Sequence, residues 1–184
     1  MSSHLVVIGN FHLANLSPPS FFSNSAYELM PEQQRRKNHM QYGMTLCSHT
    51  LNNCPDDNEL FFTAITQINH GGPSFISDPS KRMMIAKLNL KAGKLSIELS
   101  DYASALSLFD HGISYLGDDK WTSEYELTLN LFDAAAEAAC ILNKNAAVTS
   151  YTERVVAHVK SFDDSLNCKY LLQSVISFCM VCHL

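Results

Sequence analysis

The stretch from residue 92 to residue 113 constrains the fold of this chain more than any other. Gly93 lies near the end of one run with a helical period, and Asp101 begins a turn. Two antiparallel helices that pack closely need small residues where their backbones cross and aromatic residues that fill the gaps. After the turn, such residues recur at offsets of three, four and three, at Tyr102, Ala105, Phe109 and Gly112. The stretch therefore predicts a helical hairpin that buries its faces by stacking on neighbouring hairpins.

Helical periods and capping residues continue along most of the chain, and no alternating strand pattern interrupts them. Residues 1–25 differ, because the adjacent Pro18 and Pro19 block a helix there, so we expect an irregular lead-in followed by one helical domain over residues 26–184. The first expected helix is 33–50, and the second is capped by Asp56 or Asp57 and ended by residues 70–73. Asp78 and Pro79 open the third, and the fourth runs from Asp101 to Gly117. Thr122 or Ser123 opens the fifth, and two more follow residues 143–145 and residues 161–164. The sequence predicts an all-α fold, an α-α superhelix of about three hairpins.

In the helix opened by Asp78 and Pro79, apolar residues recur at helical spacing. The expected buried stripe is Ile85, Leu88, Ala92, Leu95 and Leu99.

Composition narrows the class of protein. The chain has 184 residues, of which 46% are hydrophobic, which suits one domain with a substantial core. A net charge of −5 argues against a nucleic-acid binder, because no excess of cations exists to displace phosphate counterions. Six irregularly spaced cysteines without a preceding secretory signal read as reduced thiols, and no apolar run is long enough to span a membrane. We expect a cytoplasmic protein that binds neither nucleic acid nor membranes.

The hairpin resembles the tetratricopeptide repeat. In that pattern Gly93 takes the small position of the first helix, and Ala105, Phe109 and Gly112 take the signature positions of the second. Two residues depart from it: Asn89 stands where an aromatic residue or Leu is usual, and Ser96 stands where Tyr is usual. The resemblance implies a helical-repeat scaffold that binds other proteins.

A longer resemblance covers residues 26–176. The runs 26–34, 39–43, 88–94 and 121–139 are similar to the region after the ATPase module in large multidomain signalling proteins. Those proteins combine a Ser/Thr-kinase-like module, a predicted AAA/STAND-type ATPase, a helical-repeat region and often sensor histidine-kinase modules. The resemblance implies that this chain is the repeat region alone, a fragment truncated at its C-terminus.

Cysteine and histidine clusters raise two metal or cofactor hypotheses. Cys179, Cys182 and His183 have the spacing of c-type haem attachment, but they follow an apolar helix with no export signal, so we favour a buried helix end. Cys47, His49 and Cys54 could join Cys179 and Cys182 in a zinc site, but paired knuckles are missing. Cys140 and Cys168 read as core residues. We therefore expect no metal and no cofactor.

No catalytic motif emerges. Gly93-Lys94 is not a phosphate-binding loop, because Leu88 stands in place of the first Gly and Leu95 in place of the Ser or Thr that meets magnesium. No nucleophile elbow or kinase catalytic loop is present. We therefore expect a protein that is not an enzyme.

Three lysines share one helix face, because they lie four and three residues apart. In the repeat register they suggest a groove for an acidic peptide, although a solvated face is the simpler interpretation. They are Lys87, Lys91 and Lys94.

Together these features favour a non-catalytic scaffold that links modules of a signalling protein and binds protein partners. The alternative is part of an ATP-binding kinase or ATPase whose catalytic modules lie outside this chain. The last helix is apolar nearly all round, so we expect self-association through residues 171–184.

Overall fold

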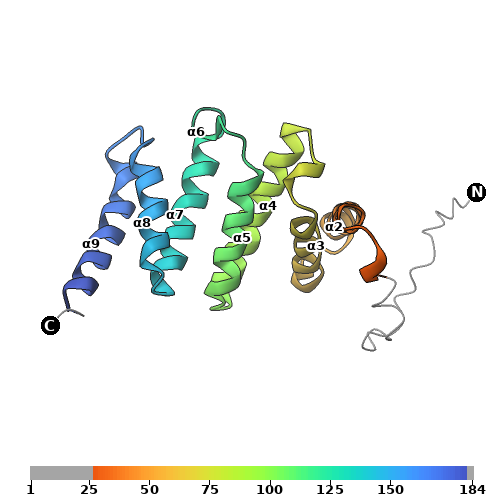
Figure 1. The fold of residues 1–184 in the computed structure, drawn as a ribbon, viewed down its shortest axis with the longest axis horizontal. Helices are drawn as coiled ribbons and strands as arrows, with labels where there is room; N and C mark the ends of the chain where they lie inside the picture. The colour runs from red at the N-terminus through yellow and green to blue at the C-terminus, as the bar shows by residue number, and fades with distance from the viewer. Residues whose placement is uncertain (1–26, 182–184) are drawn as a thin grey trace, which may run out of the picture. The chain divides into compact units, whose positions relative to one another are not determined.

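The computed structural model describes residues 27–181, with the backbone alone from residue 174 onwards. Regular structure in this range is helical, without strands, so the predicted all-α fold is confirmed there. The elements are α2 (Glu32–Asn53), α3 (Asn58–Gly71), η1 (Pro73–Phe75), α4 (Pro79–Glu98), α5 (Tyr102–Tyr115), α6 (Lys120–Ser123), α7 (Tyr125–Ile141), α8 (Asn145–Val156), η2 (Asp163–Ser165) and α9 (Leu166–Val181) (Figure 1). The predicted irregular lead-in, residues 1–25, lies outside the described residues.

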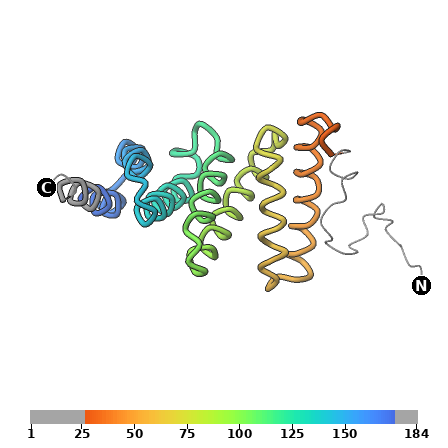
Figure 2. Tube along the Cα trace, turned by 60° about the horizontal axis from the view of Figure 1, so that its bottom comes forward, coloured from red at the N-terminus to blue at the C-terminus, as the bar shows by residue number. Residues whose placement is uncertain are grey.

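The chain divides into two compact units, residues 1–35 and residues 36–184. In the first unit, the Arg35 guanidinium lies 5.2 Å from the centre of the Tyr27 ring. The second unit carries α3 to α9, which follow one another side by side in chain order, as the Cα trace also shows (Figure 2).

Aspartates begin three of these helices as their sequence positions predict. The carboxylates of Asp57, Asp78 and Asp101 accept hydrogen bonds from the backbone N–H groups of the first turns of α3, α4 and α5. These bonds satisfy donors that a helix start otherwise leaves unpaired. Gly72 ends α3 with a φ of 79°, a conformation that favours glycine. Local capping chemistry thus sets these boundaries.

The start of α7 corrects the prediction that Thr122 or Ser123 would cap it. Both hydroxyls instead donate to the Asp119 carbonyl oxygen, within the short helix α6. Glu124 is the N-cap of α7 and makes no side-chain capping bond. The reason is that Ser and Thr can bond back to a carbonyl of the preceding turn as readily as they cap the following helix.

Helices α4 and α5 form the predicted hairpin, and small residues let them approach closely. A Cβ atom added to Gly93 would lie 2.2 Å from Cε1 of Phe109, which is fully buried. Gly112 makes a similar contact with the next hairpin, where an added Cβ would lie 2.7 Å from Cδ2 of Leu131 in α7. Ala105 is fully buried, whereas Tyr102 is half-buried.

The buried face of α4 differs from the expected stripe. Leu99 is 71% exposed, and Leu88 and Leu95 are only half-buried. Ile85 and Ala92 of the expected stripe are fully buried. Hydrophobic periodicity found only part of the buried face because close packing also selects Asn89, Gly93 and Ser96 there. The buried residues are Ile85, Ala86, Asn89, Ala92, Gly93 and Ser96.

The helices α7, α8 and α9 continue the succession. The alanines of α7 are almost all buried in the main core, which extends from α2 to α9. A smaller apolar cluster joins this end of the unit and consists of Trp121, Phe132, Val155 and Cys168. No helix in the described range is both long enough and apolar enough to span a bilayer.

Polar bonds join α3 to its neighbours. The side-chain amides of Asn69 in α3 and Asn89 in α4 exchange two hydrogen bonds, of 2.7 and 3.1 Å. The Tyr115 hydroxyl at the end of α5 donates to the Ile68 carbonyl oxygen at 2.9 Å. On the other side of α3, a 2.6 Å hydrogen bond joins His39 Nδ1 in α2 to Gln67 Oε1. These bonds tie α3 to α2, α4 and α5 and thereby fix the surface between α3 and α5.

Candidate binding trough

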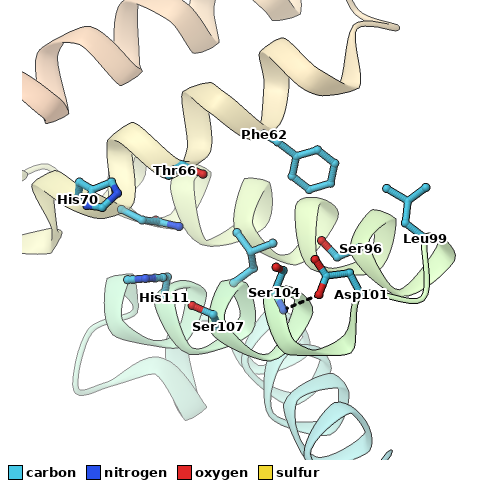
Figure 3. Close-up of a pocket in the computed structure, with 11 residues that line it drawn as sticks. Phe62, Thr66, His70, Ser96, Leu99, Asp101, Ser104, Ser107 and His111 are labelled. Atoms are coloured by element: carbon cyan, nitrogen blue, oxygen red, sulfur yellow. Dashed lines mark hydrogen bonds between the residues drawn. The ribbon is translucent and has the colours of Figure 1, made fainter. Parts of the chain in front are cut away.

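A cavity of about 550 Å³ lies between α3 and α5, with the C-terminal part of α4 along its side (Figure 3). We call it the trough. Its walls come from α3, α4 and α5, three successive helices of the second unit. The lining residues are Phe62, Thr66, Asn69, His70, Ser96, Leu99, Asp101, Ser104, Ser107, Leu108 and His111.

Ser96 on α4 is the best-buried polar residue of the lining, with 3% of its surface exposed. In the repeat register predicted from the sequence, this is a position where Tyr is usual. A serine side chain is much smaller than a tyrosine ring, so a ring here would take up part of the trough. The second departure from the pattern, Asn89, is fully buried and holds Asn69, another lining residue, by the paired amide bonds. Both departures thus bear on the trough.

One end of the trough is apolar. Phe62 of α3 is half-buried, and Leu99 at the end of α4 is 71% exposed (Figure 3). Both side chains, with Thr66, also line an adjoining recess along α3, whose other residues include Glu59. The trough therefore continues past its apolar end into a surface that carries a carboxylate.

Carboxylates supply the formal charge of the lining. Asp101 accepts a 3.1 Å hydrogen bond from the Ser104 N–H, and hydrogen bonding by Ser104 lowers the pKa of its carboxyl. Glu59 is the other acid, in the adjoining recess. Neither lining set contains a Lys or Arg. Negative charge therefore gathers near the apolar end at neutral pH.

The opposite end carries two imidazoles, His70 of α3 and His111 of α5 (Figure 3). Burial lowers the pKa of His111, and the neighbouring His70 lowers it further, while Asp110 acts in the opposite direction. His111 is therefore neutral at pH 7 and offers one donor and one acceptor. His111 can therefore form hydrogen bonds at this end without adding charge.

The serines and histidines of the trough lining are not joined as a nucleophile and its base. Ser107 and His111 lie four residues apart on one face of α5, as a nucleophile and its base could. Among the described residues, however, no hydrogen bond joins a lining serine to either histidine, and no group of three His, Cys, Asp or Glu side chains is placed to hold a metal ion. The lining can bind and orient a ligand by hydrogen bonds and apolar contact.

The three lysines on α4 lie outside the trough lining. All three are exposed, and the Lys91 ammonium lies 5.0 Å from the centre of the Phe61 ring. Neither Lys87 nor Lys94 lines the trough or the adjoining recess. The acidic-peptide groove therefore stays a prediction. The repeat-signature residues, by contrast, lie in the packed α4–α5 hairpin described above.

Cysteines occupy varied environments. Cys168 is fully buried, donates to Asp133 Oδ1 at 3.4 Å, and has its pKa raised to about 12, chiefly by burial. Burial also raises the pKa of Cys47, while Cys54 and Cys140 are half-buried. The proposed haem residues Cys179, Cys182 and His183 lie outside the part whose side chains are described, so the zinc set that includes them is not tested.

Comparison of the chain with protein-family models, with curated proteins and with solved structures finds no match.

Sequence reasoning did not find the trough. The hydroxyl, amide and imidazole groups of its lining form no sequence motif. They come close together only because α3 packs beside α5. The signal that was present is the pair of departures from the repeat pattern, Asn89 and Ser96.

Proposed function

We propose that residues 36–184 form a non-catalytic, tetratricopeptide-like helical-repeat module that binds a segment of a partner protein in the trough. In this proposal the stacked hairpins act as a scaffold, and the module couples the parts of a larger signalling protein, as the family resemblance implies. The observation that carries the proposal is the trough beside the buried Ser96, which has a small hydroxyl where the predicted repeat register would place a ring.

The chemistry of the trough supports a peptide as the ligand. Hydroxyl, amide and imidazole groups along the walls can pair with backbone N–H and C=O groups of an extended segment, and the apolar end can take one side chain. A segment bound in this way needs no rearrangement of the helices, because the trough is already open.

Selection from a displayed random-peptide library against the full chain tests the proposal. We expect peptides that bind the parent with micromolar dissociation constants, measured by calorimetry. Ser96→Tyr, which introduces the residue usual at this position of the predicted repeat, should fill part of the trough and weaken binding at least tenfold. Circular dichroism and urea unfolding show whether Ser96→Tyr keeps its fold. Ser107→Ala is a second variant that makes a smaller change in the trough lining.

A control distinguishes the trough from the lysine face. Lys87→Glu combined with Lys94→Glu reverses charge on α4 without touching the trough lining. We expect selected peptides to bind this variant within twofold of the parent. Peptides that lose binding to the lysine variant, yet bind Ser96→Tyr normally, would move the partner site to the lysine face and contradict the proposal.

A further inference from the structure

We propose that the segment bound in the trough carries an apolar side chain with a lysine or arginine close to it in sequence. This inference rests on the proposed function and names the chemistry of the partner. It follows from the apolar end of the trough and from the charges around that end.

The apolar end provides an anchor site. Leu99 exposes 71% of its surface beside the half-buried Phe62, and both border the trough and the recess that continues it. An apolar side chain placed between them would remove both from water, and apolar surface removed from water contributes favourably to association. A segment without an apolar side chain would leave this end uncovered.

The charges select the neighbouring residue of the partner. Asp101 lies on the trough side of the anchor site, and Glu59 lies on the recess side. No lining cation neutralises either carboxylate, and the lowered pKa of Asp101 keeps it ionised through the neutral range. A cation beside the apolar side chain complements this end, whereas an acidic residue there is repelled.

At the far end, His111 is neutral at pH 7 for the reasons given above, and Asn69 presents an amide. The carboxylates that select a basic residue of the partner lie at the anchor end.

Three matched fluorescent peptides test the inference by anisotropy against the full chain. They share a Ser/Gly decapeptide background and carry Leu with Arg, Leu with Glu, or Ala with Arg at the same two positions. We expect the Leu–Arg peptide to bind tightest. Exchanging Arg for Glu should weaken binding at least tenfold, and exchanging Leu for Ala should weaken it about tenfold.

Neutral variants locate the charge effect. Asp101→Asn retains a side-chain oxygen at the helix cap, so α5 keeps its start while the charge is lost. We expect Asp101→Asn and Glu59→Gln each to weaken binding of the Leu–Arg peptide by about two- to fivefold, the size of effect typical of an exposed ion pair. The combined variant should lose most of the preference for the Arg peptide over the Glu peptide. Asp78→Asn is the matched control, since it makes the same change at the cap of α4, outside the trough, and should leave binding within 1.5-fold, roughly the error of the assay.

The inference is overturned if the Arg and Glu peptides bind equally, or if the preference for Arg survives in the combined variant. It is also overturned if none of the three peptides binds while library-selected peptides without basic residues do. That last outcome leaves the proposed function standing, because the library presupposes no charge. Failure of both the library and the matched peptides rejects the proposed function as well.

Discussion

At the scale of single residues, the fit between Gly93 and Phe109 determines how closely α4 and α5 approach. The ring fills the space that any larger residue at position 93 would need, and it is fully buried, so it has little room to move. Protein interiors are packed as densely as organic crystals, which makes such contacts sensitive to one methyl group.

We predict that Gly93→Ala destabilises the protein by about 1–3 kcal/mol, although alanine is the better helix former, because overpacking of the ring outweighs propensity. Urea unfolding measures the change. Lys94→Ala, at the next and exposed position, should change stability by no more than about 0.5 kcal/mol. Replacing the ring by Leu in the double variant Gly93→Ala/Phe109→Leu should relieve the overpacking. The double variant should therefore lose less stability than the sum of the losses of the two single variants. Equal midpoints for Gly93→Ala and the parent contradict the packing described here.

A second residue-scale prediction concerns Cys168. Only the thiolate is nucleophilic, and a pKa of about 12 leaves very little of it at pH 8. We expect iodoacetamide to label Cys168 at least about a hundredfold more slowly than the half-buried Cys54, measured by site-resolved mass spectrometry of the folded protein. In denaturant the two rates should converge. Comparable rates in the folded state contradict the buried placement of Cys168.

At the scale of elements, α3 is attached to α4 by an unusual contact. The amides of Asn69 and Asn89 pair across the two helices, and Asn89 also donates to the Ile85 carbonyl oxygen at 3.1 Å. A fully buried amide is costly when it is left unpaired, so this pair specifies one position of α3 relative to α4.

We predict a measurable coupling between the two amides. Asn89→Ala should cost about 1–3 kcal/mol, since Asn69 loses its partners at a half-buried site. In the double-mutant cycle with Asn69→Ala, we expect a coupling energy of about 1 kcal/mol in urea unfolding. Hydrogen exchange should also quicken in α3 more than in α8. Additivity of the two substitutions within about 0.3 kcal/mol would falsify the amide pairing.

Prediction from the sequence succeeded for elements that depend on local chemistry. The caps at Asp57, Asp78 and Asp101 involve a side chain and a backbone N–H two or three residues away, so the sequence alone identifies them. The buried face of α4 was only partly predicted, because the burial of Asn89 and Ser96 depends on neighbours from other helices. The trough was missed for the same reason, since its lining comes from three helices.

At the scale of the whole molecule, the C-terminal end of the second unit exposes apolar side chains at helical spacing. Phe162, Leu166 and Tyr170 are 68%, 48% and 72% exposed, and they lie four residues apart before and along α9. Repeat arrays usually cover such a face with a further helix or a polar cap.

We predict that the chain self-associates through this end, in line with the apolar composition of residues 171–184. Light scattering at tens of micromolar should show a species larger than the monomer, and Phe162→Ser combined with Leu166→Ser should lower its apparent mass. Leu51→Ser, a matched change at an exposed leucine of α2, should leave the mass unaltered. A monomeric parent chain, or identical behaviour of both variants, argues against self-association at this end.

The small residue at position 96 also has an evolutionary consequence. If the trough depends on the small side chain at position 96, one substitution there opens or closes it while the helices around it are inherited unchanged. Duplicated copies of such a hairpin could then bind different segments while keeping the same fold. Sequence divergence at this position would report a change of partner rather than a change of architecture.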